Sequence, residues 1–329
     1  MAQTNPKMAD PITAKALRPT LEALLREAKQ AGATHADTLA THGRSAAITV
    51  RDGDLEDIDN SESRDIGLRV FVGRRQACVS SSDVSPASLT ALAQRAVAMA
   101  KLAPEDPYCG LAGLPDLSSV TDGEGMDLYD PSELSPAELK ARALKVEAAA
   151  KSVKGVMQAE GANASAASAA RYFMTSHGFE GGWQSSHFGL SVAAIAEKDG
   201  AMERDYDFAN ARWLEDLRSP EAIGQLAGER TVARLGAKQL PSSSLPVMFD
   251  RRVSGALIGS LLGAISGTAI TRGVSFLKDK LGEPIFGPHI NIIDDPTPTR
   301  DKRPSVVENL SRWVSVHTKP FNVPFVCGL

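Results

Sequence analysis

The sequence has few aromatic residues and few cysteines, and it carries no excess of positive charge. Aromatic residues make up only 5% of the 329 residues, so the core has to be packed with small and branched aliphatic side chains. The three cysteines, Cys78, Cys109 and Cys327, are odd in number and lack CxxC spacing, which disfavours a disulfide framework and a cysteine-rich zinc site. A net charge of −4 disfavours nucleic-acid binding.

Export and membrane signals are also missing. The N-terminal segment MAQTNPKMADPITAK contains no apolar run of the kind found in a secretory signal, so we predict a cytoplasmic protein. One uncharged segment, VSGALIGSLLGAISGTAI, has glycine at every fourth position, which is also a pattern of paired transmembrane helices. Its glycines and serines lower its hydrophobicity and aromatic belts are absent, so we predict no membrane contact.

Residues that could catalyse a reaction or bind a metal are scattered. No two of the six histidines are three or four residues apart, as two ligands on one helix face would be. A turn centred on Gly181-Gly182 would bring His177 and His187 together as a weak candidate metal pair, although satisfied histidines on a sheet are the commoner outcome. The sequence has no GxSxG nucleophile motif. The acidic run 52–59 does not follow calcium-loop spacing and is interpreted as a solvated turn.

The clearest structural pattern lies between residues 52 and 108. A two-residue Gly73-Arg74 loop predicts a hairpin with a type II′ turn, in which Val72, Val70 and Leu68 pair with Arg75, Ala77 and Val79. Ser85 followed by Pro86 predicts the start of a helix. The expected buried stripe of this helix consists of Leu89, Leu92, Ala96, Met99 and Ala103.

Other segments extend this pattern of sheets covered by helices. Helices are predicted from Ala14 to Ala31, after Ser135-Pro136 with a capping box to Glu138, and after Ser219-Pro220. The run between 103 and 134 is rich in Pro, Gly, Asp and Ser and predicts a linker. Residues 156–212 predict three or four antiparallel strands with turns at Gly161, Gly181-Gly182 and Asp199-Gly200.

The segments SESRDIGLRVFVGRRQACVSSSD, SPASL and APEDPY resemble the N-terminal domain of the TldD/PmbA family, specifically its TldE (PmbA) type subunit. The resemblance extends from about residue 33 to about residue 296. It implies a role in bacterial proteolysis, in which TldD-like and TldE-like subunits pair and the TldD-like subunit carries zinc on a His-Glu-x-x-x-His type motif. In this chain that motif would fall on residues 258–263, whose side chains offer only one weakly ligating hydroxyl.

The resemblance therefore implies a non-catalytic subunit of a heterodimeric zinc peptidase that acts on unfolded peptides. No catalytic, cofactor-binding or metal-binding residues are assigned in this chain, and zinc is expected in the TldD-like partner. Two alternatives stay open: a regulatory binding protein of the gyrase-modulator or toxin–antitoxin type without proteolysis, and a stand-alone metallohydrolase. The candidate packing or interface residues are the glycines of the four-residue ladder, Gly255, Gly259, Gly263 and Gly267.

We expect an α+β fold in which antiparallel sheets are covered by helices in two domains, followed by the start of a β-rich third domain. The expected parts are an N-terminal extension and helix (1–32), an α+β domain (33–104), a linker (105–134), a central α+β domain (135–243), a partial C-terminal domain (244–296) and an atypical tail (297–329). The tail has no sustained period, so we expect weak packing there. A truncated or frameshifted end and a divergent, functional end both fit its sequence.

Overall fold

A computed structural model describes residues 13–117, 121–123, 126–288, 290–294, 313–318 and 323–328. The chain forms two compact units, residues 1–235 and residues 236–329.

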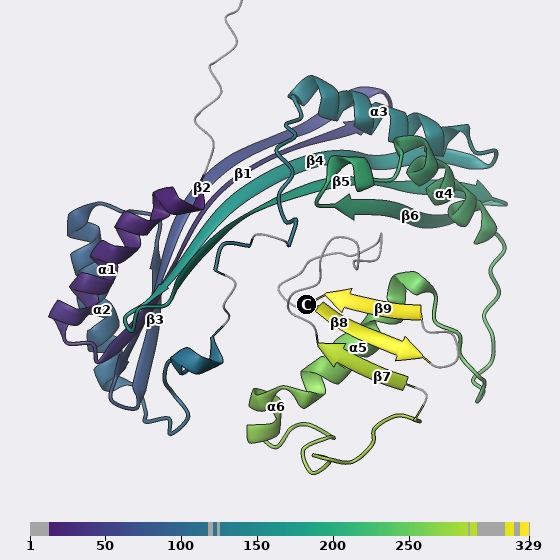
Figure 1. The fold of residues 1–329 in the computed structure, drawn as a ribbon. Helices are drawn as coiled ribbons and strands as arrows, with labels where there is room; N and C mark the ends of the chain where they lie inside the picture. Colours follow the sequence, from purple (N-terminus) through teal and green to yellow (C-terminus); the bar gives the residue numbers. More distant parts are fainter. Residues whose placement is uncertain are drawn as a thin grey trace, which may run out of the picture. The chain divides into compact units, whose positions relative to one another are not determined.

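The first unit is built on one curled antiparallel sheet of six strands (Figure 1). Its order is β3-β2-β1-β4-β5-β6. The two sheet domains predicted from the sequence are therefore joined in one sheet, because four strands of 17 to 20 residues run through both regions. The strands are β1 (His35–Arg51), β2 (Asp54–Val72), β3 (Arg75–Ser81), β4 (Val156–Thr175), β5 (Glu180–Lys198) and β6 (Ala201–Ala211).

Tight turns join most neighbouring strands. The predicted Gly73 hairpin is confirmed, with Val72 opposite Arg75 and Leu68 opposite Val79. Asp52-Gly53 and Asp199-Gly200 both have positive φ at the two positions, as a type I′ turn requires. The solvated turn expected over 52–59 is wrong beyond Gly53, because β2 begins at Asp54.

Two of the turns predicted within 156–212 are placed differently. Gly161 has φ +58 and lies at a register shift in β4, where it makes a bulge rather than a turn. Gly181 and Gly182 lie inside β5, opposite Phe173 and Tyr172, and the chain reverses at residues 176–179 instead. Strand pairing therefore continues past the glycines that were expected to end it.

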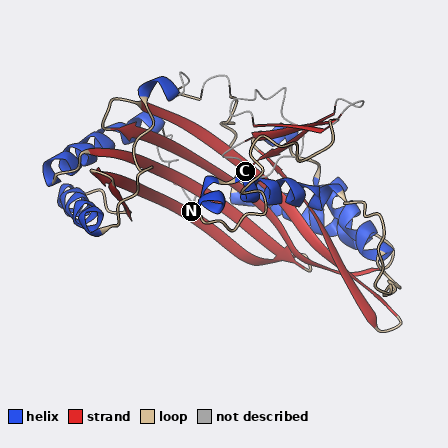
Figure 2. Ribbon diagram, turned by 90° about the horizontal axis from the view of Figure 1, so that it is seen from below, coloured by secondary structure: helices blue, strands red, loops and turns tan. Residues whose placement is uncertain are grey.

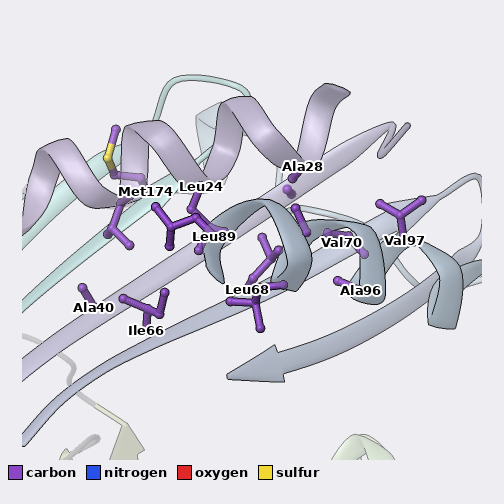
Figure 3. Close-up of a cluster of buried hydrophobic side chains, with 14 of the residues drawn as sticks. Leu24, Ala28, Ala40, Ile66, Leu68, Val70, Leu89, Ala96, Val97 and Met174 are labelled. Atoms are coloured by element: carbon purple, nitrogen blue, oxygen red, sulfur yellow. The ribbon is translucent and has the colours of Figure 1, made fainter. Parts of the chain in front are cut away.

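The four α-helices described in this unit cover the same face of the sheet (Figure 1), and Figure 2 shows the long strands from below. A short 3₁₀ turn (Ala14–Leu17), α1 (Arg18–Ala31) and α2 (Pro86–Leu102) cover one end. Their core contains Leu24, Leu89 and Leu68 (Figure 3). Met99 is 46% exposed and α2 ends at Leu102, so the predicted stripe is wrong at its last two positions, Met99 and Ala103, whereas Leu89, Leu92 and Ala96 are buried.

The other end of the sheet is covered by α3 (Pro136–Ser152) and α4 (Pro220–Ala233). The predicted capping box between Ser135 and Glu138 is confirmed. The core here uses smaller side chains, and α4 approaches α3 closely enough that a Cβ on Gly224 would lie 2.2 Å from the carbonyl oxygen of Val146. Two short 3₁₀ turns, Leu114–Asp116 and Leu214–Asp216, complete the unit.

The segment predicted as a linker borders the sheet where β6 stops. β6 pairs with β5 only as far as Phe188. Beyond that point the N–H of Ser186 donates to the carbonyl of Leu128 (3.1 Å), and that of Gly182 donates to Thr121 (2.7 Å). The linker therefore satisfies part of an edge that β6 leaves open.

The second unit contains α5 (Arg251–Ile265), α6 (Gly267–Thr271) and a three-stranded antiparallel sheet in the order β7-β8-β9. Its strands are β7 (Ile290–Asp294), β8 (Trp313–Thr318) and β9 (Val323–Gly328). Two of these strands fall in the predicted atypical tail, whose other residues lie outside the described ones. Within the described residues, no helix combines the length and the apolar character needed to cross a bilayer.

Candidate functional site

Residues 258–263, where the resemblance would put a zinc motif, lie in the middle of α5. Asp250 caps this helix by accepting a hydrogen bond from the N–H of Arg252 (2.9 Å). The one polar side chain among the six, Ser260, donates to the carbonyl of Ala256 in its own helix (2.9 Å). The donor set does not fit zinc, which needs imidazole, thiolate or carboxylate ligands.

The glycine ladder extends from α5 to Gly267, the first residue of α6, and lies in open surroundings. Gly259, Gly263 and Gly267 are exposed, and a Cβ on any of them would meet no described atom within 4 Å. Gly255 is half-buried. Leu257 and Ile265 are about half exposed, so the described residues show no close packing at these glycines, which were candidates for a packing role. That the ladder contacts a partner subunit stays a prediction.

The structure does not bring His177 and His187 together. His177 lies in the turn after β4, with Nδ1 2.8 Å from Thr175 Oγ1 and Nε2 2.9 Å from the carbonyl of Ala112. His187 pairs with Ala167, eight positions before the end of β4, or roughly 26 Å along the strand. Among the described residues, no three His, Cys, Asp or Glu side chains could share a metal ion.

The most extended surface of the first unit is the sheet face opposite the helices. Because side chains alternate along a strand and Ala36, Ala40 and Ile48 face the helices, the odd-numbered residues of β1 face the other way. This open face has a polar centre, where Arg171 Nη1 donates to Ser185 Oγ (2.9 Å) beside His187. Burial, followed by the charge of Arg212, lowers the pKa of His187 and favours its neutral form.

One edge of this sheet is acidic and unpaired. β3 pairs only with residues 66–72 of β2. All twelve residues from 54 to 65 are exposed, and within the described part of the chain β1 is the only strand beside them. Asp57, Asp59 and Asp65 lie on the open face, opposite Thr49, Ala47 and Thr41 of β1. They make no ion pair with any other described residue. We call residues 54–65 the acidic edge.

On the helix-facing side of the acidic edge, the charges are paired within the sheet. Glu62 Oε2 lies 3.1 Å from Arg44 Nε, and Glu62 Oε1 lies 2.7 Å from His42 Nε2. The hydrogen bond from Arg44, followed by that from His42, lowers the pKa of Glu62 to about 2. The two faces of the acidic edge therefore differ. On the helix-facing side Glu62 is compensated, whereas on the open face Arg51 pairs with Glu56 (2.8 Å) and leaves the three open-face aspartates without an ion-pair partner among the described residues.

The opposite edge of the sheet, β6, has its charges compensated. Asp207 is buried between Arg230 (2.6 Å) and Arg218 (2.7 Å), and the other charged side chains of β6 also have ion-pair partners. The acidic edge was not predicted from the sequence, because β1 and the first half of β2 were not expected to be strands. The alternation of acidic residues with Ile58, Asn60 and Ser61 after Asp52-Gly53 is the signal that could have revealed it.

Comparison with known proteins agrees with the two-unit architecture. The sequence matches the PmbA/TldA metallopeptidase domain 1 over residues 36–100, the central domain over 129–235 and the C-terminal domain over 242–307. The last match continues past residue 296, where the resemblance had been expected to end. The boundaries predicted for the individual parts stay predictions.

Relatives of this kind include the metalloprotease PmbA of Escherichia coli O157:H7, which is 33% identical over 76% of this chain and 55% of its own length. A PmbA homolog of Haemophilus influenzae is 27% identical over 85% of this chain and 62% of its own length. The chain thus spans a little over half the length of these curated relatives.

Solved structures share the fold. A protein from Bacteroides thetaiotaomicron described as a modulator of DNA gyrase superposes with a TM-score of 0.78 at 22% identity, covering 85% of this chain and 64% of that one. TldE from Thermococcus kodakarensis superposes with a TM-score of 0.64 at 20% identity, covering 84% of this chain and 62% of that one. Together with the three consecutive domain matches, these similarities show that the chain belongs to the PmbA/TldD metallopeptidase family, as a member of the PmbA/TldE type.

Proposed function

We propose that this chain is a non-catalytic subunit of a heteromeric zinc peptidase that acts on unfolded peptides. The zinc, its water and the general base would come from a TldD-like partner subunit. This chain would contribute an enclosing sheet surface and strand edges that hold a peptide in extended form.

The observation that supports this proposal most directly is the chemistry of residues 258–263. Ile, Gly, Ser, Leu, Leu and Gly occupy the positions where the catalytic subunits of the family are expected to carry His-Glu-x-x-x-His. The hydroxyl of Ser260 donates a hydrogen bond within its own helix, and the two candidate histidines of the first unit are far apart. We therefore do not propose a stand-alone metallohydrolase.

A second candidate is a regulatory protein-binding role without proteolysis. The solved structures from Bacteroides thetaiotaomicron and Thermotoga maritima are both described as modulators of DNA gyrase, and the latter covers 91% of this chain with a TM-score of 0.70 at 20% identity. The acidic net charge disfavours direct DNA contact but permits contact with another protein.

Co-purification separates the two candidates. The full chain is expressed with a TldD-like subunit that carries the His-Glu-x-x-x-His motif, and the complex is tested for cleavage of an unstructured peptide. We expect a stable complex that cleaves the peptide and loses its activity when the partner's zinc is chelated. A complex without peptidase activity would favour the regulatory role.

The chain alone gives the complementary test. We expect no stoichiometric zinc after mild dialysis and no peptide cleavage, because no suitable ligand set is present at residues 258–263. Elemental analysis is the measurement. One tightly held zinc ion per chain that is lost in His177→Ala or His187→Ala would contradict the proposed non-catalytic role.

A further inference from the structure

The acidic edge has the properties of a docking strand. It is twelve residues long, which corresponds to about 40 Å of extended chain, and the residues that the structure describes supply a pairing strand on only one side. Proteins usually shorten, cover or charge such an edge, because its free N–H and C=O groups can pair with another chain. Here β3 covers residues 66–72 and leaves the rest of β2 open.

Charge determines which chain this edge can accept. The edge contains six acidic residues and one arginine, so antiparallel pairing with the same edge of a second copy would bring like charges opposite each other. A segment with Lys or Arg at alternate positions would instead meet Asp57 and Asp59 on the open face. Those two carboxylates are neighbours along one face and have no cationic partner among the described residues.

The sheet already contains the contact that such a segment would make. Asp37 of β1 and Arg69 of β2 are directly opposite each other on the same open face, and Arg69 Nε donates to Asp37 Oδ2 (2.9 Å). Their ion pair lies where β2 is flanked by strands on both sides. Asp57 and Asp59 lie farther along the same strand, beyond the end of β3, where the described residues place a strand only on the β1 side.

We propose that the acidic edge, residues 54–65, binds an extended basic peptide segment as an added antiparallel strand, with its Lys or Arg side chains on Asp57 and Asp59. The proposal deepens the proposed function, because it names the strand that holds a peptide and the charge of the peptide. Cationic side chains on one face and backbone hydrogen bonds along the edge together select an extended, basic chain.

The test is peptide binding to the full chain, measured by fluorescence anisotropy. A labelled (Lys-Thr)₆ peptide is compared with (Glu-Thr)₆ and with (Lys-Pro)₆, which keeps the positive charge but loses half of its N–H donors and favours polyproline II. We expect the (Lys-Thr)₆ peptide to bind at least about tenfold more tightly than either control at low salt. Hydrogen exchange should slow at residues 54–65 when the peptide is bound.

Two double variants test the location. Asp57→Asn with Asp59→Asn should weaken (Lys-Thr)₆ binding about tenfold, since two cross-strand ion pairs are lost. Glu197→Gln with Asp199→Asn removes the same charge from the exposed β5–β6 hairpin and should leave binding unchanged.

Equal loss in both double variants, equal binding of (Lys-Pro)₆, or protection of β6 in place of residues 54–65 would overturn the proposal. Because the partner subunit is not needed, the result is independent of the co-purification test. Loss of binding here would leave the proposed subunit role standing, and a failed co-purification would leave the docking strand standing.

Discussion

Helices α4 and α5 carry the same spacing of glycines in opposite surroundings. In α4, Gly224 and Gly228 are four residues apart and press against α3, where a Cβ would meet atoms at 2.2 and 2.7 Å. In α5, Gly259 and Gly263 have the same separation, and a Cβ would meet nothing described within 4 Å. The longer, more conspicuous ladder is thus the open one. Glycine spacing indicates a smooth helix face, and only the tertiary structure decides whether that face is occupied.

The largest effect is expected for Gly224→Ala. The new methyl group would lie against the carbonyl oxygen of Val146, the Cβ of Ala149 and the N–H of Ala150, none of which can move without separating α3 from α4. We expect a loss of about 2 kcal/mol in the free energy of unfolding, even though alanine is the better helix former. Urea denaturation measures the effect.

Gly228→Ala is the matched control within α4. Its closest neighbour is the side chain of Val153, at 2.7 Å, which can adjust more easily than backbone, so we expect a smaller loss of about 1 kcal/mol. A Gly224→Ala variant as stable as the unmodified chain would show that α3 and α4 are not in close contact.

The opposite result is expected at Gly263. Replacement by alanine adds no contact and improves helix propensity, so it should stabilise α5 by up to about 1 kcal/mol. Hydrogen exchange of the α5 amides, measured in the chain alone, is the appropriate readout. Slower exchange in Gly263→Ala would support the open environment, and faster exchange would contradict it.

Gly263→Leu extends the comparison to a partner. In the chain alone, the larger side chain has room and should leave stability nearly unchanged. If the ladder contacts the backbone of a partner subunit, the same substitution should reduce pull-down of that subunit while Gly228→Ala does not. Undiminished pull-down by Gly263→Leu would rule out the ladder as the interface.

The smallest expected effect is a pH dependence confined to the sheet unit. Burial lowers the pKa of His187 below its usual 6.5, so the unfolded chain takes up a proton at this residue more readily than the folded chain does. The contribution of neutral His187 to the free energy of unfolding is therefore present above that usual pKa and is lost as the pH falls below it. From about pH 7.5 to about pH 5.5, we expect His187→Asn to remove up to about 1 kcal/mol of the dependence seen in the unmodified chain.

Denaturation of both proteins across this range provides the measurement. The exchange of the α5 amides serves as the internal control, since His187 belongs to the other unit. Identical pH profiles for the two proteins would show that His187 is as easily protonated in the folded as in the unfolded chain.

Much of the local structure could be predicted from the sequence. The Gly73 hairpin, the serine caps at Ser85, Ser135 and Ser219, and most inward positions of the helices all depend on neighbours within a few residues. The long strands were harder. β1 has no clear apolar alternation, and its centre is polar on both faces. Its pairing with β4 joins residues such as Asp37 and Thr175, which are far apart in the sequence.

The candidate site, too, was predictable from the sequence only in part. Which residues occupy positions 258–263, and hence the poor fit to zinc, is a property of the sequence alone. The separation of His177 from His187 follows from the register of β4 and β5, because strand pairing continues through Gly181 and Gly182. Glycine weakens a strand, so the two glycines predicted a turn. A strand tolerates glycine, however, and the backbone hydrogen bonds of the long β4–β5 pairing stabilise the strand through both positions.

The family, most helix starts, the Gly73 hairpin and the acidic character of residues 54–65 follow from the sequence alone. The three-dimensional fold was needed to show that those acidic residues form an edge of the sheet beyond β3, and that the glycines of α4 rather than those of α5 are packed. The physical reason is that caps and turns are settled by hydrogen bonds between near neighbours. Edges and helix contacts depend on which distant segments come to lie beside them.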